Sequence, residues 1–352
     1  MNHFDYVRPA TVSEAVAAAA EPGAVYLAAG TNLLDLMKGG VACPSRLVDV
    51  TRLPGLDRIQ HLADGRVRIG AMVRNADLAR DPDFVRSYPA VAEALLSGAS
   101  AQLRNAATVG GNLLQRTRCA YFYDTASACN KRQPGSGCDA RDGESRLQAV
   151  LGWSSSCIAT NPSDFCVPLV ALDAVVEIEG RAGRRELALD ALHRLPGDQP
   201  ERDSLLDPGD LITAVRLPGE ARRFAAHARY LKLRERTSYA FALVSATAAL
   251  RIDNGMISEA RLALGGVAAK PWRARPAETL LVGCRPEAKA FRRAAEAALA
   301  DARPSADNAF KIELAKRIAV RALMLAAAGT PARIAALPAS PFAPALGARH
   351  DA

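Results

Sequence analysis

Four cysteines lie close together in the middle of the chain: Cys119, Cys129, Cys138 and Cys157. Thiolates bind metals, and four of them in a segment with few core residues suit a metal centre that orders the segment and performs chemistry. The 9, 8 and 18 residues between them are wider separations than those of zinc ribbons or of the ferredoxin run. Spacing therefore predicts a metal site without naming the metal.

The other three cysteines are expected to be structural. Cys166 lies nine positions after Cys157 and could replace it as a ligand on spacing alone, but we expect a core thiol. Free cysteine behaves as a small hydrophobic residue, so Cys43 and Cys284 are predicted to be buried. The odd total of seven argues against complete disulfide pairing.

Two glycine-containing segments could hold a diphosphate. In residues 27–33, small side chains and Gly30 connect a predicted strand to a helical turn, so that backbone N–H groups can approach phosphate oxygens. Taken alone, this segment is more simply a plain strand-to-helix turn, and it lacks the three-glycine Rossmann pattern. Residues 102–114 contain a glycine pair beside a hydroxyl and an amide. Together, the two segments favour one diphosphate held between them.

The composition excludes several classes of protein. Of 352 residues, 49% are hydrophobic and 23% are charged, which is typical of a globular protein with two or three domains. The net charge of +8 comes from scattered basic residues without a basic and aromatic face, which argues against nucleic-acid binding. No apolar run is long enough for a membrane helix, and residues 1–20 lack the pattern of a signal peptide.

Regular elements are predicted before the cysteine-rich segment. Thr11 and Glu14 have the spacing of a capping box and begin a helix that ends near Pro22. Strands are predicted at 24–29, 47–50 and 66–71, with helical turns at 33–38, after Asn75 and at 90–96. Residues 117–163 show few regular apolar patterns, which predicts a long irregular insertion that needs a function or a staple.

The second half of the chain predicts longer strands and helices. A strand pair is expected at 174–179 and 184–189, a strand at 211–217, and further strands at 227–233, 243–252 and 256–264. Asn254-Gly255 predicts a hairpin turn between the last two. Amphipathic helices are predicted at 286–300 and 308–327, followed by a flexible or partner-bound tail rich in Ala and Pro.

Several motifs give the chain a specific resemblance to one family. AAGTNLL and ATVGGNLL, in this order, resemble the two pyrophosphate loops of the FAD-binding subunits of the xanthine dehydrogenase and carbon monoxide dehydrogenase family. The resemblance covers residues 4 to about 327 and departs from the family at Ala29, where a second glycine is common. Further matches are PSD at 162–164, LIT at 211–213, YLKLR at 230–234, SYAFA at 238–242 and GGVAAKPWR at 265–273.

The resemblance implies an α+β fold. A two-part α/β FAD-binding domain of the PCMH, or vanillyl-alcohol oxidase-like, type would precede an α+β domain with an antiparallel sheet and helices. The expected parts are FAD-binding subdomain 1 at 1–58, subdomain 2 at 59–220 with the insertion at 115–163, the C-terminal domain at 221–330 and the tail at 331–352.

The resemblance also implies a set of FAD-binding residues. Ile212 and Lys232 would lie beside the flavin, and Asp164 on its ribityl or adenosine side; without the resemblance, Lys232 would be a solvated strand residue. The five histidines are dispersed and none adjoins a proposed loop, so covalent attachment of the flavin is not expected. The diphosphate would contact Leu27, Ala28, Ala29, Gly30, Thr31, Asn32, Leu33, Thr108, Gly110, Gly111 and Asn112.

The cysteine motif has a resemblance of its own. RTRCAYFYD, CNKR, PGSGC and CIATNPSD resemble the insertion in flavin subunits of periplasmic aldehyde oxidoreductases, which holds one 4Fe-4S cluster. This implies Cys119, Cys129, Cys138 and Cys157 as its ligands. Positive charge beside them would raise the reduction potential of a cluster, although a solvated basic loop is the plainer interpretation. The basic residues concerned are Arg116, Arg118, Lys131 and Arg132.

The implied function is the FAD- and 4Fe-4S-containing electron-transfer subunit of a molybdenum-dependent aldehyde oxidoreductase. A large subunit would hold molybdenum, a small subunit would hold 2Fe-2S clusters, and this chain would carry no catalytic residue for aldehyde oxidation. Periplasmic location by co-export with a signal-bearing partner is expected, with the cytoplasm as the alternative. Two other functions stay open: a zinc-stabilised assembly subunit without redox chemistry, and a stand-alone FAD oxidase, for which no catalytic base is evident.

Overall fold

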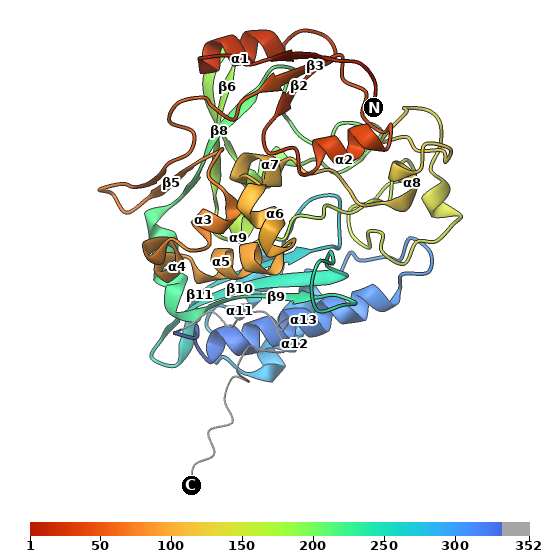
Figure 1. Ribbon diagram of the computed structural model, residues 1–352. Coiled ribbons are helices and arrows are strands. Elements are labelled where there is room, and N and C mark those ends of the chain that lie inside the picture. The colour runs from red at the N-terminus through yellow and green to blue at the C-terminus, as the bar shows by residue number, and fades with distance from the viewer. Residues whose placement is uncertain (333–352) are drawn as a thin grey trace.

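The computed structural model describes residues 1–332, which form three sheets in successive parts of the chain (Figure 1). Nearly all of the tail predicted at 331–352 lies outside the described residues. In the described part, no helix has the length and apolar character needed to cross a membrane.

The first sheet has three parallel strands in the order β1-β3-β2. The strands are β1 (Asp5–Val7), β2 (Ala24–Leu27) and β3 (Arg46–Asp49), and the connections contain α1 (Val12–Ala19) and α2 (Leu33–Lys38). The predicted cap of α1 is present, because Thr11 Oγ1 accepts from the Glu14 N–H at 3.2 Å. The Glu14 carboxylate reaches back to the N–H of Ala10, one residue earlier than a standard capping box.

The second sheet has five antiparallel strands in the order β4-β5-β8-β6-β7. These are β4 (Ile59–His61), β5 (Val67–Gly70), β6 (Val175–Gly180), β7 (Gly183–Ala188) and β8 (Leu211–Leu217). The central hydrophobic core packs against this sheet. Its helices are α3 (Asn75–Leu78), α4 (Pro82–Ser87), α5 (Pro89–Ser97), α6 (Ala101–Ala106), α7 (Val109–Leu113), α9 (Cys166–Ala171) and α10 (Leu189–Leu192).

The third sheet is antiparallel, in the order β12-β11-β10-β9, and the long helices cover one of its faces (Figure 1). Asn254 and Gly255 have φ angles of +52° and +75°, as a type I′ hairpin turn requires, which confirms the predicted hairpin. Its strands are β9 (Ala228–Leu233), β10 (Val244–Asp253), β11 (Met256–Gly265) and β12 (Trp272–Arg273). Its helices are α11 (Arg275–Leu281), α12 (Ala288–Ala298) and α13 (Phe310–Ala327), and the 3₁₀-helix η2 (Gly219–His227) precedes β9.

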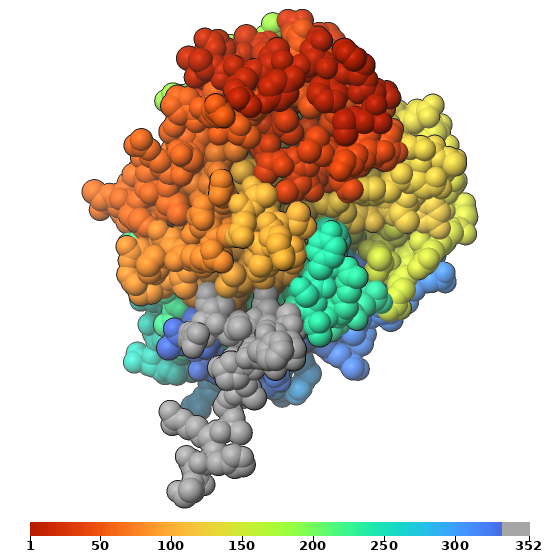
Figure 2. All heavy atoms as spheres, in the orientation of Figure 1, coloured from red at the N-terminus to blue at the C-terminus, as the bar shows by residue number. Residues whose placement is uncertain are grey.

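The three sheets agree with the expected α+β fold, in which a two-part α/β region precedes a domain with an antiparallel sheet. Between α7 and α9 the chain is irregular, as predicted, with only α8 (Ala120–Tyr123) and the turn η1 (Asp139–Arg141) among its regular elements. This insertion forms one flank of the molecule beside the N-terminal part (Figure 2). It places the four cysteines next to the region that follows β2.

Candidate functional site

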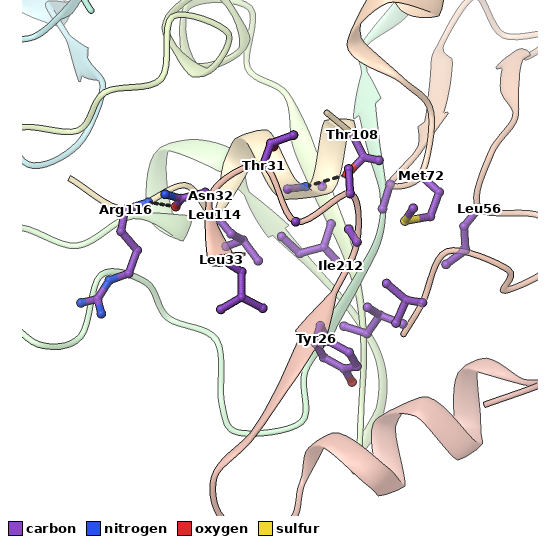
Figure 3. Close-up of a pocket in the computed structure, with 18 of the residues that line it drawn as sticks. Tyr26, Thr31, Asn32, Leu33, Leu56, Met72, Thr108, Leu114, Arg116 and Ile212 are labelled. Carbon is purple, nitrogen blue, oxygen red and sulfur yellow. Dashed lines mark hydrogen bonds between the residues drawn. The ribbon is translucent and has the colours of Figure 1, made fainter. Parts of the chain in front are cut away.

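A cavity of about 240 Å³ lies where the N-terminal sheet meets the five-stranded sheet (Figure 3). Its walls come from the segment after β2, the segment before and within α7, and the beginning of β8. These segments are far apart in the sequence, so the cavity exists only because the fold joins the two subdomains. The two predicted glycine loops therefore do meet at one site.

The first loop turns sharply at Gly30. Its φ of +73° is a left-handed conformation that favours glycine, and a Cβ there would lie 2.7 Å from the Leu34 side chain. Asn32 and α2 follow directly, and the Asn32 Oδ1 accepts from the backbone N–H of Arg116 at 2.9 Å. The loop is thus shaped by glycine and tied to the start of the cysteine insertion.

The second loop is the start of α7. Thr108 caps this helix, and its Oγ1 accepts from the Gly111 N–H at 3.3 Å. Gly110 packs so closely that a Cβ would lie 2.9 Å from Ala71 Cβ, whereas a Cβ on Gly111 would meet only Thr108 Oγ1 within 4 Å. Gly110 is therefore required for packing, and Gly111 leaves open space on the cavity side.

The cavity is apolar at one end and lined by backbone and hydroxyl groups at the other. Tyr26, Leu56, Met72 and Ile212 surround the apolar end, while Thr31 and Thr108 approach the other end from the two loops (Figure 3). Such a cavity can take a ligand with a flat apolar group and a polar linker.

Ten of the fourteen predicted cofactor-binding residues line this cavity, and four do not. The four are Leu27, Asn112, Asp164 and Lys232. Asn112 lies next to the cavity-lining Gly111, but its Oδ1 accepts from Ser163 Oγ at 2.9 Å. Those that line it are Ala28, Ala29, Gly30, Thr31, Asn32, Leu33, Thr108, Gly110, Gly111 and Ile212.

Asp164 and Lys232 form a buried ion pair of their own. Lys232 Nζ lies 2.7 Å from Asp164 Oδ2, and their side chains are 3% and 8% exposed. Tyr230 donates its hydroxyl to Asp164 Oδ1 at 2.6 Å, and burial beside this carboxylate raises the Tyr230 pKa well above its ordinary value. Lys232 is thus not the solvated strand residue that its position in the sequence alone suggests. The pair joins β9 of the third sheet to the segment before α9.

The four insertion cysteines gather in one small hydrophobic core with Phe122 and Ile158. Cys129 and Cys138 face each other in an isolated antiparallel bridge. Burial raises the pKa of the Cys119, Cys138 and Cys157 thiols, and neighbouring cysteines of this group raise each of them further. Cys119, Cys129 and Cys157 are buried, and Cys138 is half-buried. The fold therefore brings the four predicted ligands to one place.

The thiols do not form a site for a single ion. Within residues 1–332, no group of three or more His, Cys, Asp or Glu side chains is arranged to hold a metal ion. A zinc site would need its thiolates about 2.3 Å from one central ion, which brings them close to one another. The donor set is soft, and all four of its members lie in the same core.

A second, more polar cavity of about 270 Å³ lies between the insertion and the second loop. Sequence reasoning missed both His193 and Asp203, which line it. His193 is expected to adjoin neither loop, yet its Nε2 lies 2.8 Å from the carbonyl oxygen of Leu113, at the end of α7. Burial lowers the pKa of His193. No local motif predicts this contact, because it joins residues that are 80 positions apart.

The burial of the remaining three cysteines agrees with the prediction for one of them and differs for the other two. Cys166 is fully buried in the central core, as predicted, and burial raises its pKa to about 12. The prediction for Cys43 and Cys284 is wrong, because Cys43 is exposed and Cys284 is half-buried. Cys43 lies in irregular chain after α2, and Cys284 lies in a bend after α11.

Comparison with known proteins gives matches along most of the chain. Residues 2–220 match the family described as the FAD binding domain in molybdopterin dehydrogenase, and residues 229–326 match the CO dehydrogenase flavoprotein C-terminal domain. The chain is 48% identical over 319 residues to the aldehyde oxidoreductase FAD-binding subunit PaoB of Escherichia coli, covering 90% of this chain and 96% of that protein.

More distant relatives cover similar lengths. The carbon monoxide dehydrogenase medium chain of Hydrogenophaga pseudoflava is 27% identical over 326 residues, which is 91% of this chain and 96% of that one. Among solved structures, reconstituted CO dehydrogenase from Oligotropha carboxidovorans has a TM-score of 0.74 at 25% identity and covers 94% of this chain and 99% of its own.

Proposed function

This chain belongs to the FAD-binding subunits of the molybdenum hydroxylase family, and we propose that it is the electron-transfer subunit of an aldehyde oxidoreductase complex. The proposal is carried by one observation: two loops with the family's diphosphate-binding motifs line one cavity, with a cysteine-rich insertion beside it. The similarity to the PaoB subunit supports an aldehyde as the substrate of the complex.

The cavity fits FAD. Small residues at Ala28, Ala29 and Gly111 leave the backbone open to a diphosphate, and the apolar end can accept a ring system. The hydroxyls of Thr31 and Thr108 would hold polar groups of the cofactor between these two ends. When bound, the flavin supplies the ability to take up electrons one at a time and release them singly or in pairs.

We also propose that Cys119, Cys129, Cys138 and Cys157 hold one 4Fe-4S cluster. Each thiolate of such a cluster binds a different iron, so the four sulfurs stand farther apart than ligands of a single ion. The gathering of the four thiols in one core supports a shared metal centre, and the resemblance of the cysteine motif to the insertion of periplasmic aldehyde oxidoreductases supports a cluster over zinc. Lys131 stands two positions after Cys129 and is only 5% exposed, so its charge would offset the negative charge of the cluster.

Aldehyde oxidation itself is assigned to partner chains. A large subunit with the molybdenum cofactor and a small subunit with 2Fe-2S clusters would complete a heterotrimer, as the term "medium chain" for the carbon monoxide dehydrogenase relatives supports. The role of this chain would be to hold FAD and the cluster, exclude solvent from them and pass electrons to the terminal acceptor.

Analysis of the purified complex tests the proposal. The complex should contain flavin, iron and molybdenum, and anaerobic addition of an aldehyde should bleach the flavin absorption only when the partner chains are present. Stoichiometric zinc without iron would favour the assembly subunit. Aldehyde or alcohol oxidation by this chain alone would favour a stand-alone oxidase.

We further propose that the chain is exported to the periplasm together with a signal-bearing partner. The support is the resemblance of its cysteine motif to that of periplasmic aldehyde oxidoreductases. Cell fractionation with and without the twin-arginine signal of the partner tests this. Export of this chain that does not depend on the partner's signal would refute it.

A further inference from the structure

Arg116 touches both the first FAD loop and the cysteine insertion. It lines both cavities, and its backbone N–H donates to Asn32 Oδ1 at 2.9 Å. Its guanidinium lies over the Phe122 ring, 4.7 Å from the ring centroid. Phe122 belongs to the core that contains the four thiols. A movement of either region would therefore change the contacts of Arg116.

Asp203 fixes Arg116 from a third segment, the connection between α10 and β8. Its Oδ2 accepts from Arg116 Nε at 2.7 Å, and its Oδ1 accepts from Lys131 Nζ at 2.5 Å. Lys131 also donates to the carbonyl oxygen of Pro200 at 2.6 Å. One carboxylate thus joins Arg116, whose backbone is bonded to the first loop of the FAD cavity, to a buried cation beside the proposed cysteine ligands.

The charges make this bridge sensitive to substitution. Burial opposes ionisation of Asp203, but the charges of Lys131 and Arg116 outweigh it and hold the pKa of Asp203 below its ordinary value. The carboxylate is therefore ionised at neutral pH and is shared by two cations. Without it, the buried ammonium of Lys131 would lose its anionic partner, which is unfavourable in a poorly solvated place.

We propose that Asp203 is a positioning residue that couples the FAD site to the cysteine site, so that each cofactor binds more tightly when the other site is ordered. The inference rests on the proposed FAD and 4Fe-4S functions and adds an energetic link between them. Because coupling between two sites is reciprocal, loss of the cluster should weaken FAD binding as much as loss of FAD weakens the cluster.

A double-mutant cycle tests the coupling. The dissociation constant of FAD is measured by flavin fluorescence on the deflavinated full chain, in the native protein, Asp203→Asn, Cys138→Ser and the double variant. Asp203→Asn and Cys138→Ser should each weaken FAD binding about tenfold, a common size for such coupling. In the double variant, Asp203→Asn should add no more than about twofold, because its partner site is already lost.

Two results would overturn the proposal. One is that Asp203→Asn and Cys138→Ser have additive effects on the free energy of FAD binding, and the other is that Asp203→Asn leaves the FAD affinity unchanged. A matched control is Glu278→Gln, which removes the charge of another buried carboxylate, one that binds Arg273 and the Leu262 N–H. It should lower thermal stability without changing FAD affinity.

Two further measurements keep the test decisive. If Asp203→Asn does not fold, the same double-mutant cycle is carried out with Lys131→Met. This substitution removes the ion pair between Lys131 and Asp203 and keeps the one between Arg116 and Asp203. Electron paramagnetic resonance of the reduced protein should show an altered cluster signal in Asp203→Asn, which a purely structural carboxylate would not produce. Iron analysis of the native protein stands apart: absence of iron there would refute the cluster assignment, whatever the FAD affinities are.

Discussion

The FAD cavity and the cysteine insertion lie side by side but are held in place by different means. The cavity is built on regular elements, with each glycine loop placed at the start of a short helix next to a sheet. The insertion has almost no regular structure and is held by side chains that bind distant carbonyl oxygens. Local motifs therefore specify the first region, and long-range contacts specify the second.

The anchors of the insertion are specific. Arg132 donates to the carbonyl oxygens of Tyr121 and Phe122 at 2.8 and 2.9 Å. Fully buried Lys311, on α13, donates to the carbonyl oxygens of Leu147, Gln148 and Gly266. From the sequence, the insertion is expected to have too little regular apolar pattern to order itself, and these anchors add contacts that do not involve a metal.

The largest effect is expected from the four cysteines proposed as cluster ligands. Serine at any of Cys119, Cys129, Cys138 or Cys157 should remove about four irons per chain, because one missing ligand destabilises the whole cluster. Cys166→Ser is the control and should keep its iron, since Cys166 lies in the central core. Iron analysis and electron paramagnetic resonance of the reduced protein give the measurement.

The same variants distinguish the part of the insertion that the proposed cluster would order from the part that the side-chain anchors hold. Hydrogen exchange should increase around residues 119–141 and stay slow around 147–151, where Lys311 and the C-terminal core hold the chain. Iron lost from Cys166→Ser but kept in Cys157→Ser would overturn the ligand assignment.

A smaller effect is expected in the FAD cavity. Gly111→Val would place a branched side chain in the open space beside Thr108, where the diphosphate is proposed to lie. A steric clash there of about 1–3 kcal/mol, the size of overpacking in a core, corresponds to roughly a fivefold to 150-fold weaker affinity for FAD. Gly39→Val, at the end of α2 with ordinary contacts around its Cβ position, should keep the cofactor. Flavin content after gel filtration tests both, and full occupancy in Gly111→Val would exclude this loop from the FAD site.

The smallest effect per step of the experiment is a pH dependence of the free energy of unfolding at Lys311. Burial lowers its pKa from 10.5 to about 7, so between these values the unfolded chain binds more protons than the folded chain. The free energy of unfolding should therefore rise with pH in this window, by at most about 1.4 kcal/mol per pH unit.

Lys311→Met should flatten this pH dependence and lower the stability, because three carbonyl oxygens lose their donor. Lys289→Met, at an exposed position of α12, should leave the slope unchanged. Denaturant unfolding at several pH values measures both, and an unchanged slope in Lys311→Met would show that this lysine is not its source.

Features set by neighbouring residues could be predicted from the sequence. The Thr11 cap, the Asn254-Gly255 turn and strand 211–217 are present as predicted, because each depends on a few adjacent residues. The diphosphate loops belong to the same class, since a glycine is needed at Gly30 for its local backbone conformation. Short elements such as β1, α9 and α11 were not predicted, because their patterns are too brief to stand out from irregular chain.

Features set by tertiary contacts could not be predicted from the residues alone. From its position in the sequence alone, Lys232 resembles a surface residue of a strand. In the structure, its partner is Asp164, which is 68 positions away. Arg116 and Asp203 are separated by 87 residues, and neither lies in a motif that indicates the other. The bridge between the FAD cavity and the cysteine insertion is of this kind, and only the three-dimensional structure brings its three residues together.

The contact between Lys311 and Gln148 has a consequence for the biosynthesis of the protein. These residues are 163 positions apart. Three of the four clustered thiols precede both of them, and Cys157 lies between them. Since a chain leaves the ribosome from its N-terminus, the cysteines emerge long before α13 is made. The insertion can reach its final shape only when synthesis is nearly complete, so a metal centre bound in that shape would be completed after translation. A nascent chain stalled before α13 would carry every thiol and still lack the anchor that holds their loop.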